Sequence, residues 1–254
     1  RDTHDSRDRF GQEVAFLKYL KSIGIKASPS LIANDPTVGI VCLDWIEGAD
    51  FDSLLDSNDD YWQQCFSFLK DIQVGKNSFE ASHLPNSSEA AFSMREHLAL
   101  LQNRRDYWYA NNQAIPEEIR SFFMAELDEE YKNLAKELIS HPDFNKELEA
   151  IEKIISPSDF GLHNAKLGKD GKLAFFDFEY AGWDDPAKTI ADFFTQPAFS
   201  PPMNQLPSLL STIADILSSR NMDKLLMRLP IVFQIIRLKW SFILLNDYHP
   251  VYSK

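Results

Sequence analysis

Two stretches of helical periodicity flank a short segment with strand and turn signals, and this order limits the possible folds more than any other feature. Apolar residues recur at helical spacing across residues 59–139, with breaks near residues 82–88 and at Pro116. Short apolar runs begin at residue 151, and helical patterns resume near Pro186. The sequence therefore predicts an α/β (α+β) fold whose larger part is mainly helical.

The N-terminal part has a different order of elements. Residues 7–21 carry apolar side chains at helical spacing, and two strand-like runs follow at residues 30–33 and 39–45 with a turn signal between them. Residues 46–48 break this pattern, so we divide the chain into an N-terminal part, residues 1–47, and a larger C-terminal part, residues 48–254.

Composition excludes several classes of partner. The 254 residues are 44% hydrophobic and 25% charged, which is an ordinary globular balance. The formal net charge is −12, so nucleic acid is not an expected partner, because phosphate contacts need basic patches. A cationic small molecule would be attracted to an acidic cleft. No run of about 18 apolar residues occurs, so no membrane span is expected.

The two cysteines bear on the cellular compartment. Cys42 and Cys65 have no metal-ligand spacing, and both lie among apolar residues. We expect both to be buried free thiols, which fits a reducing cytoplasm. Neither the composition nor the spacing of residues indicates the oligomeric state.

Three oxygen-bearing side chains follow two strand-like runs. Asp159 comes after the run at residues 154–156, Asn164 lies five positions later, and Asp177 ends the run at residues 173–176. Phosphoryl transfer needs a carboxylate that accepts a proton from the attacking hydroxyl, and oxygen ligands for Mg²⁺. Each residue alone has a structural explanation, as a turn former or a helix cap. Their joint spacing on neighbouring strand ends favours a shared magnesium–phosphate centre.

Two motifs around these residues resemble one known superfamily. Residues 158–164, Ser-Asp-Phe-Gly-Leu-His-Asn, resemble the catalytic loop of the aminoglycoside phosphotransferase and choline kinase superfamily, where an Asp precedes an Asn by five positions. Residues 175–183, Phe-Phe-Asp-Phe-Glu-Tyr-Ala-Gly-Trp, resemble its metal-binding strand end, in a form similar to choline and ethanolamine kinases. Residues 184–193 resemble the segment that follows. The resemblance implies a protein-kinase-like two-lobe fold, here with an incomplete small lobe.

The resemblance also implies a nucleotide site. Residues 43–48 resemble the hinge that receives adenine on its backbone, so Asp44, Trp45 and Ile46 become candidates for nucleotide binding. Glu13, on the first helix, resembles the glutamate that pairs with the nucleotide-binding lysine. In this superfamily the glycine-rich phosphate loop and that lysine precede this helix, so we expect a segment upstream of residue 1.

The remaining roles follow from the same resemblance. Asp159 would be the catalytic base, and Asn164 and Asp177 the Mg²⁺ ligands. Glu179 would shape the acceptor pocket or support the metal loop, with a surface carboxylate as the structural alternative. Trp240 would form an aromatic wall for a quaternary ammonium through cation–π contact, with a core tryptophan as its alternative. His163 is expected to pack the loop.

The sequence thus predicts a phosphotransferase that uses ATP and Mg²⁺ to phosphorylate a hydroxyl of a small molecule, such as an aminoglycoside, sugar or amino alcohol. A choline or ethanolamine kinase is one alternative. A kinase-like pseudoenzyme, binding a nucleotide or a partner without catalysis, is another. It is favoured by the lack of a glycine-rich loop in this sequence and by Pro157, where the superfamily usually has His. A purely structural helical protein would leave the three spaced side chains unexplained.

Overall fold

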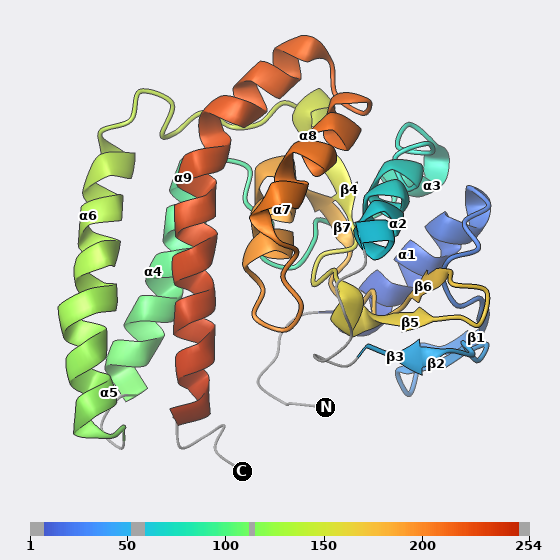
Figure 1. Cartoon of the computed structure of the whole chain (residues 1–254), viewed down its shortest axis with the longest axis horizontal. Helices are drawn as coiled ribbons and strands as arrows, with labels where there is room; N and C mark the ends of the chain where they lie inside the picture. The colour runs from blue at the N-terminus through green and yellow to red at the C-terminus, as the bar shows by residue number, and fades with distance from the viewer. Residues whose placement is uncertain (1–7, 52–58, 112–114, 249–254) are drawn as a thin grey trace.

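The N-terminal elements form as the sequence predicts. The structure is a computed structural model and describes residues 8–51, 59–111 and 115–248 (Figure 1). Helix α1 (Arg9–Ser22) begins at Asp8, whose carboxylate accepts a hydrogen bond from Gly11 N. It is followed by the antiparallel hairpin of β1 (Leu31–Asp35) and β2 (Ile40–Leu43). The expected start of the helix at residue 7 lies outside the described residues.

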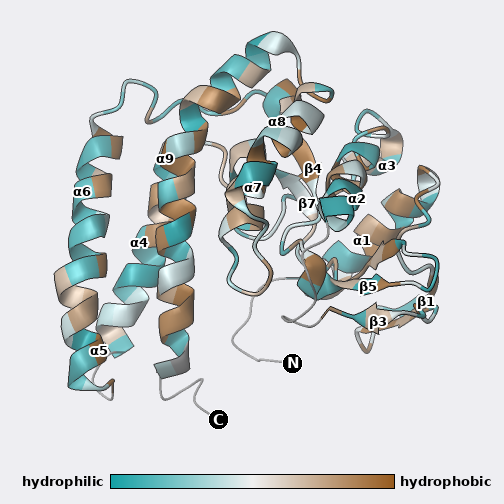
Figure 2. Ribbon diagram, in the orientation of Figure 1, coloured by the Kyte–Doolittle hydropathy of each residue, from teal (hydrophilic) through white to brown (hydrophobic). Residues whose placement is uncertain are grey.

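Helices make up most of the remaining chain, as predicted. In Figure 1, α4, α6 and α9 lie side by side at the end of the molecule opposite the hairpin of β1 and β2. Figure 2 shows hydrophobic and hydrophilic residues interspersed along α9, as expected for a helix that packs against α4 and α7 and still reaches the surface. The helices are α2 (Asp59–Asp71), α3 (Phe79–Ser82), α4 (Met94–Asn111), α5 (Glu117–Phe122), α6 (Asp128–Ile139), α7 (Pro186–Thr195), α8 (Leu206–Ala214) and α9 (Ser219–Leu244).

Short turns of other helical types complete the element order. One π-helical turn, Phe123–Leu127, joins α5 to α6. The 3-10 turns are Ala150–Glu152, Leu162–Asn164, Met203–Gln205 and Leu245–Tyr248. Within the described ranges, no helix combines the length and apolar character that a membrane span needs.

The strands that precede the candidate site belong to two different sheets, a division that the sequence did not indicate. Strand β6 (Leu173–Phe175) pairs with β5 (Ala165–Leu167), which also pairs with β3 (Ala49–Asp50). Strand β4 (Ile154–Ser156) pairs instead with β7 (Gly182–Asp184). The chain after β6 turns back, and β7 runs antiparallel to β4. The loop after β4 and the loop after β6 therefore lie close together.

Strand β7 also makes a close backbone approach to the segment that precedes α4. A Cβ at Gly182 would come within 2.3 Å of Pro85 O, so only glycine allows the segment before α4 to lie against this strand. That contact is fixed by hydrogen bonds between Ser87 N and Trp183 O (2.9 Å) and between Trp183 N and Pro85 O (2.9 Å). Strand β7 was not among the predicted strands.

An aromatic cluster beneath the loops fixes their position. The ring of Phe68, on α2, lies 5.6 Å from that of Phe160, 4.6 Å from Phe175 and 6.1 Å from Phe178, between ring centroids. All four side chains are buried. Phe160 directly follows Asp159, and Phe178 directly follows Asp177, so each polar side chain is adjacent to a buried anchor.

The two cysteines differ in exposure. Cys65, on α2, is buried as predicted, and burial raises the pKa of its thiol, which keeps it unreactive. Cys42 is exposed, so that prediction was wrong. The apolar residues around Cys42 belong to β2, whose side chains alternate between exposed and half-buried, so apolar neighbours in sequence did not mean burial.

Candidate active site

A strained loop presents Asp159. Strand β4 ends at Ser156, whose hydroxyl accepts a hydrogen bond from Ser158 N (3.0 Å). Ser158 has φ +55°, in the left-handed region that side chains other than glycine seldom adopt. Asn164 closes the loop, because its Nδ2 donates to the backbone carbonyl of Asp159 (2.9 Å). This bond uses the donor end of the amide and orients the oxygen end for another partner.

Asp177 is brought to the same place by a backbone hydrogen bond. Phe176 N donates to Asn164 O (3.0 Å), so the residue before Asp177 is tied to Asn164 directly. Asp177 itself has φ +64°, a second left-handed residue beside the first loop. Strained backbone of this kind is concentrated at functional sites, where the surrounding structure holds it in place.

The carboxylates around Asp177 repel one another. Burial and the nearby charges of Glu179 and Asp159 raise the pKa of Asp177. Burial, Asp177 and Glu179 raise the pKa of Glu13 to about 7. Arg9 opposes part of this charge through an ion pair with Glu179 (2.8 Å). The sequence-predicted residues Asp159, Asp177, Glu179 and Glu13 therefore share one electrostatic environment, with an excess of negative charge.

The donor set fits Mg²⁺ rather than a metal enclosed by protein. Among the residues that the structure describes, no three His, Cys, Asp or Glu side chains form a group that could hold a metal ion. Mg²⁺ does not need one, because it is usually held by one or two carboxylates, with phosphates and waters completing its shell. Asp177 and the amide oxygen of Asn164 offer such a partial set.

His163 contacts the carboxylate of Asp159 directly, which the sequence did not indicate. We predicted a residue that packs the loop, and the structure places its Nε2 3.3 Å from Asp159 Oδ1. His163 is the middle residue of the 3-10 turn Leu162–Asn164, which places its ring beside Asp159. The spacing of the two residues in the sequence did not indicate this contact.

The predicted nucleotide residues lie at the end of β2. Asp44 Oδ1 accepts a hydrogen bond from Ser30 N, and Asp44 N donates to Ser30 O (3.0 Å), so this residue holds the strand end in place. Trp45 is 82% exposed and therefore does not belong to the core, and Ile46 is half-buried. No hydrogen bond among the described residues joins these three positions to Asn164 or Asp177.

A cavity of about 200 Å³ opens beside the catalytic loop. Asp159 and Trp240 both line it, so the structure brings these two predicted residues together. Trp240 is half-buried, and its Nε1 donates to Asp192 Oδ1 (3.1 Å). Glu179 is not among the lining residues; it pairs with Arg9, and its charge contributes to the raised pKa of Asp177.

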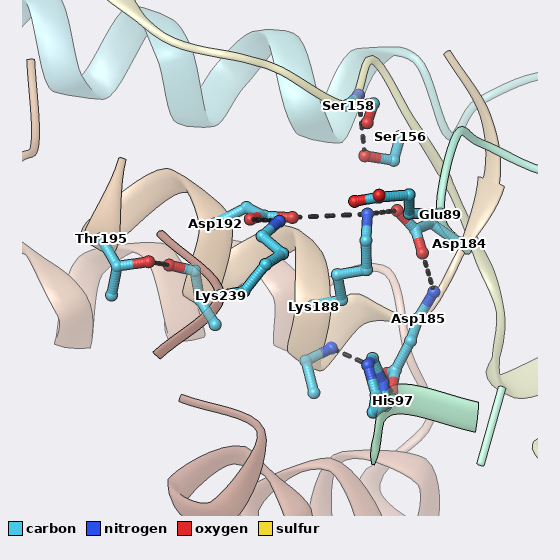
Figure 3. A network of polar contacts seen from close by, with 12 residues as sticks. Glu89, His97, Ser156, Ser158, Asp184, Asp185, Lys188, Asp192, Thr195 and Lys239 are labelled. Atoms are coloured by element: carbon cyan, nitrogen blue, oxygen red, sulfur yellow. Dashed lines mark hydrogen bonds and ion pairs between the residues drawn. The ribbon is translucent and has the colours of Figure 1, made fainter. Parts of the chain in front are cut away.

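A buried ionic network lies behind this cavity (Figure 3). Asp185 caps α7 by accepting from Ala187 N (2.8 Å), and it also accepts from Arg228 Nη1 (2.8 Å). His97 Nε2 lies 3.2 Å from the same carboxylate. Burial alone would raise the pKa of Asp185, but Arg228 and His97 lower it to about 2. The Asp-Pro sequence at a helix start signals this cap, but the sequence did not reveal its distant partners.

A second part of the network connects α7 to α9. Lys188 contacts Asp184 (2.7 Å) and Asp192 (3.3 Å), and Asp192 also pairs with Lys239 on α9. Burial alone would raise the pKa of Asp192, but the charges of Lys239 and Lys188 outweigh that effect and lower the pKa to about 2. These pairs fix α7 against α9 and shape the floor of the cavity.

Comparison with known proteins identifies the fold. No protein family model matches the chain, and no curated protein matches it. Solved structures do match. A choline kinase from Cryptosporidium parvum has a TM-score of 0.61 at 15% identity, with 99% of this chain and 75% of that chain covered. A choline/ethanolamine kinase family protein from Mesorhizobium loti has a TM-score of 0.57 at 17% identity, with 95% and 73% covered.

An antibiotic-modifying enzyme has the same fold. The aminoglycoside phosphotransferase APH(4)-Ia, in a ternary complex with AMP-PNP and hygromycin B, has a TM-score of 0.51 at 12% identity, with 93% of this chain and 77% of that chain covered. At such identities a structural likeness establishes the fold alone. The predicted α/β (α+β) architecture is therefore confirmed: this chain has the protein-kinase-like fold of the choline kinases and aminoglycoside phosphotransferases.

Proposed function

We propose that this protein is an ATP-dependent phosphotransferase that moves the γ-phosphoryl group to a hydroxyl of a small molecule. The observation that carries the proposal is the junction of two loops, where Asn164 bonds both to Asp159 and to the residue before Asp177. Asp159 also lines a cavity large enough for a small acceptor. The likeness to small-molecule kinases supports the same reaction class.

In this proposal Asp159 receives the proton of the acceptor hydroxyl as its oxygen bonds to the γ-phosphorus. The bond between that phosphorus and the bridging oxygen breaks, and ADP leaves with the electron pair. His163, 3.3 Å from one carboxylate oxygen, would hold the carboxylate of Asp159 in position. Asn164 and Asp177 would hold Mg²⁺, which when bound neutralises phosphate charge.

The nucleotide would lie against the N-terminal elements. Burial and the nearby charges of Asp177 and Glu179 raise the pKa of Glu13, and a cation such as the nucleotide-binding lysine would favour its charged form. The backbone of Asp44, Trp45 and Ile46 would receive adenine, and the exposed ring of Trp45 leaves this edge open. We also propose the division into lobes at residues 1–47 and 48–254, and a cytoplasmic location.

One alternative acceptor class has a specific observation in its favour. Trp240 and Tyr180 both line the cavity, and aromatic rings can hold a quaternary ammonium, as in a choline or ethanolamine kinase. The pseudoenzyme alternative is favoured by Pro157 in the loop. The experiment below separates catalysis from binding alone.

The test is a phosphotransfer assay on the full-length protein with ATP, Mg²⁺ and a panel of sugars, aminoglycosides and amino alcohols. Asp159→Asn should lower kcat by about 10³-fold, within the usual range for loss of a general base. The control is Asp170→Asn, at an exposed turn between β5 and β6, which should leave kcat unchanged. An unchanged rate in Asp159→Asn would remove Asp159 from this role. Nucleotide binding without transfer to any acceptor would favour the pseudoenzyme.

A further inference from the structure

The charges that line the cavity beside Asp159 are balanced. The acidic residues are Glu89, Asp159 and Asp192, and the basic residues are Arg104, Lys188 and Lys239, so three negative charges face three positive ones. Glu89 is paired with Arg104, and Asp192 is paired with Lys239 and Lys188. Asp159, which contacts His163, is the acidic lining residue without a Lys or Arg partner in the described structure, and the proposed chemistry already uses it.

The aromatic rings of the cavity already have protein cations beside them. The Lys239 ammonium lies 5.1 Å from the centroid of the Trp240 ring, and the Arg9 guanidinium lies 5.1 Å from that of Tyr180. Both distances fall within the range of cation–π attraction. A second cation placed on either ring would be repelled by the first. These rings are therefore poorly suited to hold a quaternary ammonium.

A buried hydrogen-bond donor in the cavity wall lacks a partner. Gln196 is 3% exposed, lines the cavity, and its Nε2 has no hydrogen-bond partner within the described part of the chain. Its Oε1 accepts from Ala198 N (2.8 Å) and Phe199 N (3.1 Å), which fixes the orientation of the amide. The Nε2 end lies next to the catalytic loop, 3.3 Å from the position that a Cβ would take at Gly161.

Unpaired buried donors are costly, so such a group indicates a ligand atom that accepts its hydrogen bond. Arg104 Nε, on another wall of the same cavity, is also a buried donor without a partner in the described structure. Hydroxyl oxygens satisfy donors of this kind without adding charge to a lining that is already neutral. A cationic group would find that the carboxylates of Glu89 and Asp192 already have basic partners and that each aromatic ring already has a protein cation beside it. An anionic group would be repelled by Asp159.

We propose that the acceptor is an uncharged polyhydroxylated molecule, of the sugar or polyol class, and that Gln196 Nε2 donates a hydrogen bond to one of its hydroxyl oxygens. This inference rests on the proposed function, because it assigns the acceptor of the same site. Gln196 is then a specificity-determining residue. It holds one hydroxyl while a neighbouring hydroxyl faces Asp159.

The first test measures equilibrium binding to the full-length protein by calorimetry, with Mg²⁺ and a non-hydrolysable ATP analogue present. The ligands are matched pairs: glucose with glucosamine, galactose with galactosamine, and 3,3-dimethylbutan-1-ol with choline, its charged counterpart. The uncharged sugars should bind about tenfold more tightly than their amino counterparts, the ratio expected from one poorly satisfied polar contact. Choline should bind no more tightly than its uncharged counterpart. Tighter binding of the charged members, or no binding by any uncharged sugar or polyol in a wider panel, overturns the proposal.

The second test uses Gln196→Glu. One carboxylate oxygen can still accept from Ala198 N and Phe199 N, while the other replaces the unpaired donor by a negatively charged acceptor. The preference should reverse by about tenfold towards the amino sugars. The control is Gln102→Glu, which makes the same charge change at an exposed position of α4 and should leave the preference as it was. An unchanged preference in Gln196→Glu removes Gln196 from this role.

Failure of this inference and failure of the proposed function give different results. If the protein transfers phosphate but prefers charged acceptors, the assignment of the acceptor is wrong and the phosphotransferase remains. If uncharged sugars bind in a way that depends on Gln196 but no phosphate is transferred, the cavity assignment holds and catalysis is disproved.

Discussion

Two groups of carboxylates differ in how their charge is compensated. The entrance carboxylates are Glu13, Asp159, Asp177 and Glu179, and the pKa of Glu13 and of Asp177 is raised by burial and mutual repulsion. The buried carboxylates are Asp184, Asp185 and Asp192. Burial raises the pKa of Asp184 although Lys188 opposes the shift, whereas basic partners lower the pKa of Asp185 and of Asp192 to about 2.

The buried group is held in ion pairs with Lys and Arg side chains, whereas the entrance group retains repulsion between carboxylates. Each buried carboxylate contacts a Lys or Arg from α7 or α9, and these contacts tie helices together. Among the entrance carboxylates, Glu179 pairs with Arg9, yet Glu13 and Asp177 still repel each other. Perturbed acids in a cleft are frequent at functional sites, and here they would be relieved by Mg²⁺ and a lysine.

The largest expected effect comes from the same substitution made in each group. Asp185→Asn should destabilise the protein by about 3–5 kcal/mol, because it leaves Arg228 partly buried without a charged partner. Asp177→Asn removes a carboxylate that its neighbours repel, and should leave the Mg²⁺-free protein as stable as before or more stable. Urea unfolding followed by circular dichroism measures both. Equal losses of stability would show that the two groups do not differ.

A smaller effect is expected from Mg²⁺ itself. If Mg²⁺ binds the folded protein with a Kd of about 1 mM, then about 10 mM should add about 1.4 kcal/mol to the free energy of unfolding. Asp177→Asn should abolish this gain, because Asp177 is the proposed carboxylate ligand. Thermal unfolding with and without Mg²⁺ measures it, with Asp170→Asn as the control that keeps the gain. A gain that survives in Asp177→Asn would place the ion elsewhere.

The sequence predicted the entrance group better than the buried group, because local spacing encodes the first. Asp159 and Asn164 share one loop, and Asp177 ends a strand that a turn with Gly171 places nearby. A regular hydrophobic period likewise predicted the long helices. The contacts of Asp185 with His97 and Arg228 span 88 and 43 positions, and no local pattern records such distances.

Local patterns also fail to record the other distant contacts, and this explains the remaining differences between the prediction and the structure. The position of β7 beside the segment before α4 depends on a glycine that lets Pro85 approach Gly182, and these residues lie nearly a hundred positions apart in the chain. The unpaired donor of Gln196 is visible only once the partners of its carbonyl oxygen are known. The exposure of Cys42 depends on what covers a strand, whereas the sequence shows only its neighbours along the chain.

The smallest expected effect is the pH dependence of stability in the Mg²⁺-free protein, where the two groups should act in opposite directions. Asp185 has a lowered pKa of about 2, so its contribution is present above its unfolded value near 4 and is lost as the pH falls towards 2. Glu13 has a pKa raised from 4.5 to about 7. Between those values the folded protein holds a proton that the unfolded chain has released, so stability falls as the pH rises.

Glu13→Gln should remove that decline between pH 4.5 and about 7, a change of about 1 kcal/mol after allowance for the partial exposure of this side chain. Urea unfolding at a series of pH values measures it, and Glu118→Gln, at an exposed position of α5, should keep the decline. Because Gln keeps the shape of Glu but carries no charge, a decline that persists in Glu13→Gln would mean that a raised pKa of Glu13 is not its cause. The difference between the two groups of carboxylates would then be supported by the raised pKa of Asp177 alone.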